Sequence, residues 1–316
     1  MAEKKIPVTL ITGFLGAGKT TLLNNLLTQL HDEKVAVIVN EFGEVGIDDK
    51  LILRTDEEII EMNNGAICCA VRTDTVKVLL KLTERKDLSF DRVIIETTGL
   101  ANPIPIARAF LDKPALAQRY EIDAIVTMVD ASQIGQQLKT TPEAKMQIAS
   151  ADIVLLNKID LTDERTVAIA KHDIKRINPL ATIHQTTKSD LTLETLLEAQ
   201  RDQTFVREYT TEGEEHGHDS DVTSFVLTAE QPLDLEKVGR WIGEYVLLNS
   251  ENLLRYKGLL SIEGMDERFV FQGVHEHFEN RKDRPWGDDP RVSQVVIIGK
   301  GLDQAAFEES FAQLIS

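Results

Sequence analysis

The chain has 316 residues, of which 42% are hydrophobic and 28% are charged, an ordinary composition for a water-soluble globular protein of two domains. The formal net charge of −17 argues against a nucleic-acid-binding surface, because contacts to phosphates need clustered Lys and Arg. There is no stretch of about 18 unbroken apolar residues to cross a membrane, and two cysteines cannot form a disulfide framework, so we expect a cytoplasmic protein.

Short apolar strands alternate with amphipathic helices over the first two-thirds of the chain. Strands buried on both faces and separated by helices predict an α/β fold, with a mainly parallel sheet flanked by helices. A ligand is expected at the carboxyl ends of the strands. The predicted strands are Val8–Thr12, Val35–Asn40, Arg92–Glu96, Ala124–Val129, Ile153–Asn157 and Thr182–Gln185, and helical patterns cover Asp74–Leu82 and Thr166–Ile177.

The composition changes at Thr210–Asp221, which has no apolar residue and contains His216 and His218 among acidic residues. We therefore predict three parts: a first domain at 1–208, a linker at 209–221, and a smaller C-terminal α+β domain at 222–316. The elements predicted there are a strand at Val222–Ala229, a helix at Leu235–Leu248, strands near Leu253–Ile262, Arg268–His277 and Ser293–Gly299, and a helix at Asp303–Leu314.

A glycine-rich segment lies between the first strand and a leucine-striped helix. Gly13–Thr20 reads G-x-x-x-x-G-K-T, the phosphate loop of P-loop NTPases. In this pattern backbone N–H groups surround the phosphates, the lysine reaches the β- and γ-phosphates, and the threonine hydroxyl holds Mg²⁺. The predicted nucleotide contacts are Gly13, Gly16, Ala17, Gly18, Lys19, Thr20 and Thr21.

The sequence Asn157-Lys158-Ile159-Asp160 follows the strand at Ile153–Asn157 and suits guanine. The Asp160 carboxylate can accept from the N1–H and the exocyclic amine of guanine, while Asn157 and the stem of Lys158 orient the ring. Adenine lacks that amine and presents an acceptor at N1, so the carboxylate would be left unpaired.

Two further acidic motifs follow predicted strands. Glu96 ends its strand and can support Mg²⁺, while the N–H of Gly99 can meet the γ-phosphate and sense its loss. A strand that ends in a capping glutamate is the alternative. Glu41, Glu44 and Asp48 follow the second strand, where they could position water, bind Mg²⁺ or another metal, or form a polar turn.

Cys68 and Cys69 end the loop motif Asn64-Gly65-Ala66-Ile67-Cys68-Cys69. Adjacent thiols do not readily bond to each other, but both can bind a soft or borderline cation. On the residues alone, two buried structural cysteines remain an alternative.

Taken together, the motifs G-F-L-G-A-G-K-T-T, N-E-F-G-E, N-G-x-I-C-C, E-T-T-G and N-K-I-D resemble those of the CobW-like P-loop metallochaperone GTPases, most nearly their short YjiA-type members. The C-terminal third also resembles the second domain of that family, at Leu254–Gly258, Phe271–His275 and Arg284–Asp288. The resemblance implies a slow GTPase that binds zinc and delivers it to a client metalloprotein, with GTP/GDP, Mg²⁺ and Zn²⁺ as cofactors.

The metal motif of this chain differs from that of the family at one position. The family's metal motif is C-x-C-C, and Ala66 stands where its first thiol would be. A site of three thiolates is therefore excluded, and Glu44 is a replacement zinc ligand beside Cys68 and Cys69, with Glu41 a further candidate. Two rival functions remain: a regulatory GTPase with structural cysteines, and a chaperone for cobalt or nickel.

The residues expected to carry catalysis are Lys19, Thr20 and Glu96, and the sequence offers no evident arginine finger or water-orienting glutamine. His275 and His277 are expected on one face of a strand, as surface residues or as a second metal site. Trp286 is expected to anchor a loop. Both a monomer and a homo-oligomer are compatible with these motifs.

Overall fold

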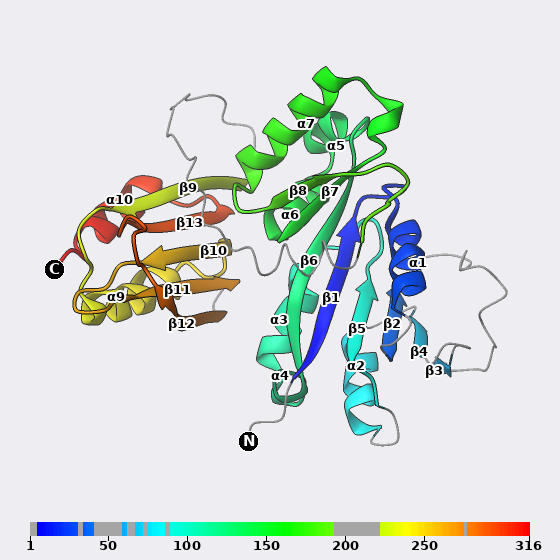
Figure 1. Ribbon diagram of the computed structural model, residues 1–316, viewed down its shortest axis with the longest axis horizontal. Coiled ribbons are helices and arrows are strands. Elements are labelled where there is room, and N and C mark those ends of the chain that lie inside the picture. The colour runs from blue at the N-terminus through cyan, green and yellow to red at the C-terminus, as the bar shows by residue number, and fades with distance from the viewer. Residues whose placement is uncertain are drawn as a thin grey trace. The chain divides into compact units, whose positions relative to one another are not determined.

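The computed structural model describes residues 5–30, 34–40, 59–61, 67–71, 75–85, 89–192, 222–274 and 277–316. The chain divides into two compact units (Figure 1). The first comprises Met1–Ile174 and Ala181–Gln203, and the second comprises Lys175–Leu180 and Thr204–Ser316. The predicted linker, with His216 and His218, lies outside the described residues. Among the described residues no helix is long and apolar enough to span a membrane.

The first unit is built on an eight-stranded sheet with the strand order β3-β4-β2-β5-β1-β6-β7-β8. All neighbouring pairs are parallel except β3 with β4, which confirms the predicted α/β fold. The strands are β1 (Ile6–Gly13), β2 (Val35–Asn40), β3 (Ile59–Glu61), β4 (Ile67–Val71), β5 (Arg92–Glu96), β6 (Tyr120–Asp130), β7 (Ile153–Asn157) and β8 (Thr182–Gln185).

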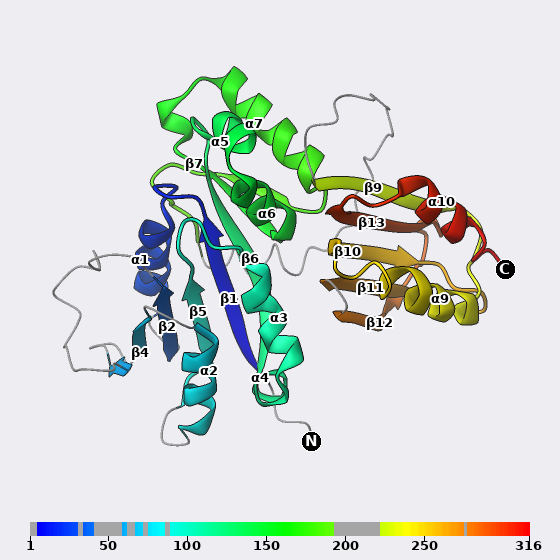
Figure 2. The same ribbon diagram turned by 180° about the vertical axis from the view of Figure 1, so that it is seen from behind.

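Helices cover both faces of this sheet. On one face Leu22, Leu23 and Leu26 of α1 pack against strand residues. On the other face, α2, α3 and α4 pack against β1, β5 and β6, and both views show α3 and α4 beside β6 (Figure 1; Figure 2). The helices are α1 (Lys19–Gln29), α2 (Thr75–Glu84), α3 (Ile104–Asp112), α4 (Pro114–Arg119), α5 (Ile134–Thr140), α6 (Pro142–Ser150) and α7 (Glu164–Ile177), with a 3₁₀ turn, η1, at Ile159–Leu161.

The second unit contains a five-stranded antiparallel sheet with the strand order β12-β11-β10-β13-β9. Its core joins one face of this sheet to two helices whose first turns are capped by Asp234 and Asp303. The elements are β9 (Val222–Ala229), α9 (Leu235–Trp241), the π-helical turn η2 (Ile242–Val246), β10 (Leu253–Leu260), β11 (Glu267–Val274), β12 (His277–Pro285), β13 (Ser293–Lys300) and α10 (Gln304–Ala312).

Three local predictions were wrong. The α-helix expected at Leu235–Leu248 ends at Trp241 and continues as the π-helical turn. The strand expected at Arg268–His277 ends at Val274, and a second strand begins at His277. His277 therefore lies on a different strand from the one predicted, and His275 lies outside the described residues.

The third correction concerns the cysteines. Cys68 and Cys69, expected in a loop, lie in β4, where they are in register with Val37 and Ile38 of β2. The short run I-C-C-A-V has a β-prone residue only at each end, Ile67 and Val71, and it forms a strand through its pairing with β2.

Candidate functional site at the phosphate loop

The glycine-rich segment joins β1 to α1 as the motif predicted. Gly18 precedes α1 and adopts φ +110°, a left-handed conformation that side chains rarely take. A Cβ atom at this position would lie 2.5 Å from Nδ2 of Asn157 and 2.7 Å from Oγ of Ser189. Glycine is therefore required both by the backbone conformation and by the close approach of the Asn157 and Ser189 side chains.

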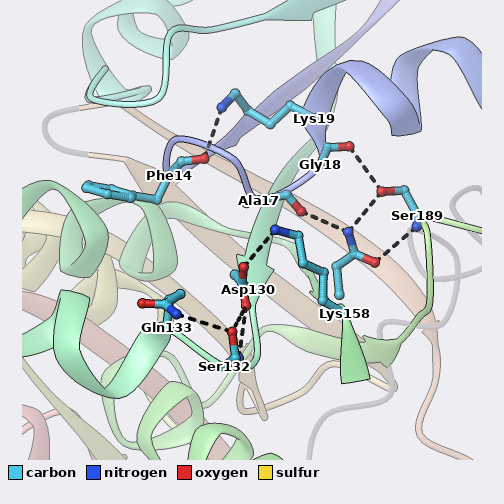
Figure 3. A network of polar contacts seen from close by, with 10 residues as sticks. Phe14, Ala17, Gly18, Lys19, Asp130, Ser132, Gln133, Lys158 and Ser189 are labelled. Carbon is cyan, nitrogen blue, oxygen red and sulfur yellow. Dashed lines mark hydrogen bonds and ion pairs between the residues drawn. The ribbon is translucent and has the colours of Figure 1, made fainter. Parts of the chain in front are cut away.

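Lys19 is the first residue of α1 and is 8% exposed. Its ammonium group folds back over the loop and donates to the carbonyl oxygen of Gly13 (2.9 Å). It also donates to the carbonyl oxygen of Phe14 (3.1 Å) (Figure 3). The positive charge thus lies over the loop that leads into the N-terminus of α1, and an anion is favoured at a helix N-terminus. The residues thus fit a bound phosphate.

Thr20 lies next to the carboxylate that ends β5. Its hydroxyl donates to Oε1 of Glu96 over 2.8 Å, and Glu96 is 5% exposed. A hydroxyl and a carboxylate form the all-oxygen donor set that Mg²⁺ prefers, with waters completing its octahedron. The two residues predicted to support Mg²⁺ are therefore adjacent, and their chemistry fits that ion.

Asn157, at the end of β7, is bonded to the phosphate loop. Its Nδ2 donates to the carbonyl of Ala17 (2.8 Å) and to Oγ of Ser189 (3.0 Å). Its Oδ1 accepts from the backbone N–H of Ser189 (3.0 Å), and the Ser189 hydroxyl donates to the carbonyl of Gly18 (3.0 Å) (Figure 3). The amide of Asn157 is thus held in one orientation by groups on both sides.

Ser189 was missed by the sequence analysis. It lies in the loop after β8, and two side chains of α1 fasten that loop: Asn25 donates to the carbonyl of Ser189 (2.9 Å) and Gln29 to that of Leu191 (3.0 Å). Lys188 and Ser189 both adopt φ +56°. Only the weak signal of a polar T-T-K-S-D run after a predicted strand could have indicated this loop.

Lys158 follows Asn157 with φ +60° and forms an ion pair with Asp130 at the end of β6 (2.8 Å). Burial acts to raise the pKa of Asp130, but hydrogen bonds from Lys158 and Ser132 outweigh it and hold the pKa below its ordinary value. Asp130 therefore stays ionised and keeps Lys158 in place (Figure 3). Asp160 is exposed and, among the described residues, has no hydrogen-bond partner, which leaves its carboxylate available.

Gly99 lies against the phosphate loop. A Cβ atom there would lie 2.7 Å from the backbone nitrogen of Leu15, so only glycine allows this approach. The structure thus brings Gly13, Ala17, Gly18, Lys19, Thr20, Glu96, Gly99 and Asn157 into one region. Of the other predicted contacts, Gly16 lies in the loop between β1 and α1, and Thr21 lies in the first turn of α1.

The predicted zinc residues are only partly described. Glu41, Glu44 and Ala66 lie outside the described residues, and for Cys68 and Cys69 only the backbone is placed. In the part of the chain that is described, no group of three His, Cys, Asp or Glu residues could hold a metal ion. The arrangement of a zinc site therefore stays a prediction.

Trp286 follows β12 and is 3% exposed. It packs with Leu259 and Val270, and the guanidinium of Arg268 lies 5.6 Å from its ring centroid. This agrees with a role as a loop anchor.

Comparison with known proteins identifies the family. Residues 7–185 match the model of the CobW/HypB/UreG nucleotide-binding domain, and residues 222–315 match the cobalamin synthesis protein cobW C-terminal domain. The zinc chaperone YjiA of Escherichia coli is 38% identical over 316 residues, covering 98% of each chain. The crystal structure of Zn(II)-bound YjiA GTPase superposes with a TM-score of 0.79 at 37% identity, covering 99% of this chain and 100% of that one.

A second structure of that relative is a Zn(II)-bound triple mutant in which one glutamate and two cysteines are replaced by alanine. It has a TM-score of 0.80 and 35% identity, and covers 99% of this chain and 100% of that one. The matches span both domains and nearly the whole length of the relatives. The chain therefore belongs to the CobW/HypB/UreG family of nucleotide-binding proteins.

Proposed function

We propose that this protein is a GTP-hydrolysing zinc metallochaperone, which couples its nucleotide state to the binding of zinc and its delivery to a client protein in the cytoplasm. The observation that carries the nucleotide part is the hydrogen bond from Asn157 to the carbonyl of Ala17. It joins the N-K-I-D motif to the phosphate loop, so that one nucleotide could meet both.

In this proposal each residue around the phosphate loop has a separate role. Lys19 neutralises charge on the β- and γ-phosphates, and Thr20 with Glu96 supports Mg²⁺, which when bound would supply further charge neutralisation. The backbone of Gly13–Thr20 donates to the phosphates. Asp160 selects guanine because its carboxylate accepts from two donors that adenine does not present, while Asn157 and Lys158 orient the ring.

The zinc part is supported by the relatives, which are named zinc chaperones, and by the thiols of Cys68 and Cys69. Thiolates suit zinc better than they suit Mg²⁺. Because Ala66 supplies no thiolate, we propose Glu44 as a further zinc ligand, and Glu41 is an additional candidate. Because a triple mutant of YjiA without a glutamate and two cysteines is also Zn(II)-bound, a zinc titration must separate this motif from other sites.

The nucleotide part is tested by comparing GTP with ATP in binding and hydrolysis, with Lys19→Ala as the inactive control. Loss of the charge at the transferring phosphoryl group is expected to lower turnover by roughly 100- to 1,000-fold. Hydrolysis that survives Lys19→Ala, or equal binding of ATP and GTP, would contradict the assignment of this site.

The zinc part is tested by competition against a chromogenic chelator, with GDP and with a non-hydrolysable GTP analogue. Coupling requires different zinc affinities in the two states, and zinc must shift nucleotide affinity by the same factor. The matched control is the double variant Cys68→Ser and Cys69→Ser, in which the nucleotide dependence should disappear. Equal affinities in all conditions would favour the rival function, a regulatory GTPase with structural cysteines.

A further inference from the structure

Gln147 on α6 is a buried polar side chain that the proposed mechanism does not use. It is 1% exposed, and its Nε2 donates to the carbonyl oxygens of Gly99 (3.2 Å) and Ala101 (3.0 Å). Burying an amide is costly unless it is hydrogen-bonded, so these two contacts define its place. The acceptors lie in the segment that directly follows the E-T-T-G motif.

The segment that Gln147 holds is a turn with other fixed points. The N–H of Ala101 donates to the carbonyl of Thr98 (3.0 Å), which closes the turn around Gly99 and Leu100. The backbone N–H of Thr97 donates to the carbonyl of Ile11 in β1 (3.0 Å). The start of the segment is thus fastened to the sheet, and its far end to α6.

The two bonds from Gln147 fix the orientation of two peptide groups. In a planar trans peptide the C=O and the following N–H point in opposite directions. Directing the Gly99 carbonyl at Gln147 therefore directs the N–H of Leu100 away from α6. Because Gly99 also contacts the backbone of Leu15, the turn lies between the phosphate loop and Gln147.

The backbone of Gln147 joins the same position to the sheet. Its carbonyl accepts from the hydroxyl of Thr127 in β6 (2.8 Å), and Thr127 is 1% exposed. This bond anchors α6 without touching the amide of Gln147. The structure therefore separates two functions at one residue: the backbone holds the helix, and the side chain holds the turn.

We propose that Gln147 is a positioning residue for the Gly99–Ala101 turn, and that it transmits the turn's response to the γ-phosphate to helix α6. The inference rests on the proposed function, in which Gly99 senses that phosphate. A change in the turn moves the two carbonyls that Gln147 binds, so α6 must follow or lose both bonds. Gln147 touches no reacting atom in this account.

The experiment compares Gln147→Met with Thr127→Val. Methionine keeps the length and flexibility of glutamine but donates no hydrogen bond, and Thr127→Val removes the neighbouring buried bond while it leaves the amide intact. We expect Gln147→Met to lower kcat for GTP about tenfold, in line with the effects of misplaced groups, and to change GDP affinity less than twofold. Thr127→Val should change both quantities less than twofold.

Hydrogen exchange provides the second measurement. In the wild-type protein the amides of α6 should exchange at different rates with GDP and with a non-hydrolysable GTP analogue, and Gln147→Met should abolish that difference. If Gln147→Met behaves as Thr127→Val in kcat and in exchange, the inference is wrong. If the wild-type protein binds no GTP analogue and hydrolyses no GTP, the proposed function fails, and that result is distinct from the former.

A second variant covers the case in which Gln147→Met does not fold. In Gln147→Glu the side chain donates only when it is protonated, so kcat relative to wild type should rise as the pH is lowered. A pH profile parallel to that of the wild-type protein would overturn the role of the side chain as a donor, since a purely structural role would not follow the protonation state.

Discussion

Removing the hydroxyl of Ser189 tests how the guanine motif is held against the phosphate loop. In Ser189→Ala two hydrogen bonds are lost, each 3.0 Å long: a buried one to Asn157 and a partly buried one to Gly18. At about 1 kcal/mol each, the network loses about 2 kcal/mol. The backbone bond of residue 189 to Asn157 and the bond of Asn157 to Ala17 remain, so the site should loosen without collapsing.

If half of that loss appears in nucleotide binding, about 1 kcal/mol, then GTP and GDP should each bind about fivefold more weakly. Both nucleotides should be affected equally, because in the proposed function Asn157 orients the guanine base, which GTP and GDP share. Isothermal titration calorimetry with GDP and a non-hydrolysable GTP analogue measures this effect. A loss confined to the GTP analogue would refute the reasoning.

Ser189→Gly is the matched control. It lacks the same hydroxyl, but glycine adopts φ +56° without the penalty of about 1–2 kcal/mol that other residues incur there. The two variants should therefore bind nucleotide equally weakly, while the glycine variant should be the more stable in denaturant unfolding. If Ser189→Gly binds nucleotide as tightly as the wild-type protein, backbone strain and not the hydroxyl governs the site.

Four further outcomes are expected. Asp160→Asn should shift preference from GTP to xanthosine triphosphate in competition binding, because the amide can donate to the carbonyl that replaces the amine of guanine. Tyr120→Phe should raise Tm by about 2–4 °C in a thermal melt, because the hydroxyl of Tyr120 is buried without a partner among the described residues. Burial also raises the pKa of Tyr120 to about 12, so between pH 10 and 12 the tyrosine ionises in the unfolded chain before it does in the folded one. The variant should therefore lose less stability than the wild-type protein over that pH range. Burial lowers the pKa of His184 below 6.5, so the unfolded chain takes up a proton first and the protein loses stability as the pH falls through 6.5. Denaturant titrations at pH 7 and pH 5 should show a smaller loss of stability in His184→Gln. Ala66→Cys should tighten zinc binding in a chelator competition, with a gain that grows with pH because thiols must lose a proton to ligate.

Much of the fold could be predicted because the first unit alternates apolar strands with amphipathic helices. Five strands, at 35–40, 92–96, 153–157, 182–185 and 222–229, have the predicted bounds. The sequence failed where tertiary pairing decides: β12, H-F-E-N-R-K-D-R-P, has almost no apolar alternation and forms a strand because it pairs with β11. β4 likewise forms a strand because it pairs with β2.

The candidate site was predictable where a motif is contiguous, as at the phosphate loop and at Asn157–Asp160. Ser189, Asp130 and Gln147 could not be found in this way, because each acts on a partner more than 25 residues away. Their roles depend on the meeting of strand ends and on α6, which no local pattern contains. The domain boundaries and the zinc ligands stay predictions.

The polar composition of β12 has a consequence for solubility. This strand is the last in the order β12-β11-β10-β13-β9, so one side of its backbone has no neighbour within the described sheet. Exposed sheet edges invite pairing with other chains, and lysine, other charges and proline along an edge discourage it. Arg281, Lys282 and Arg284 are each more than half exposed, and the strand ends at Pro285. The charged residues and the proline, which made β12 hard to predict from the sequence, thus protect the folded protein against aggregation through that edge.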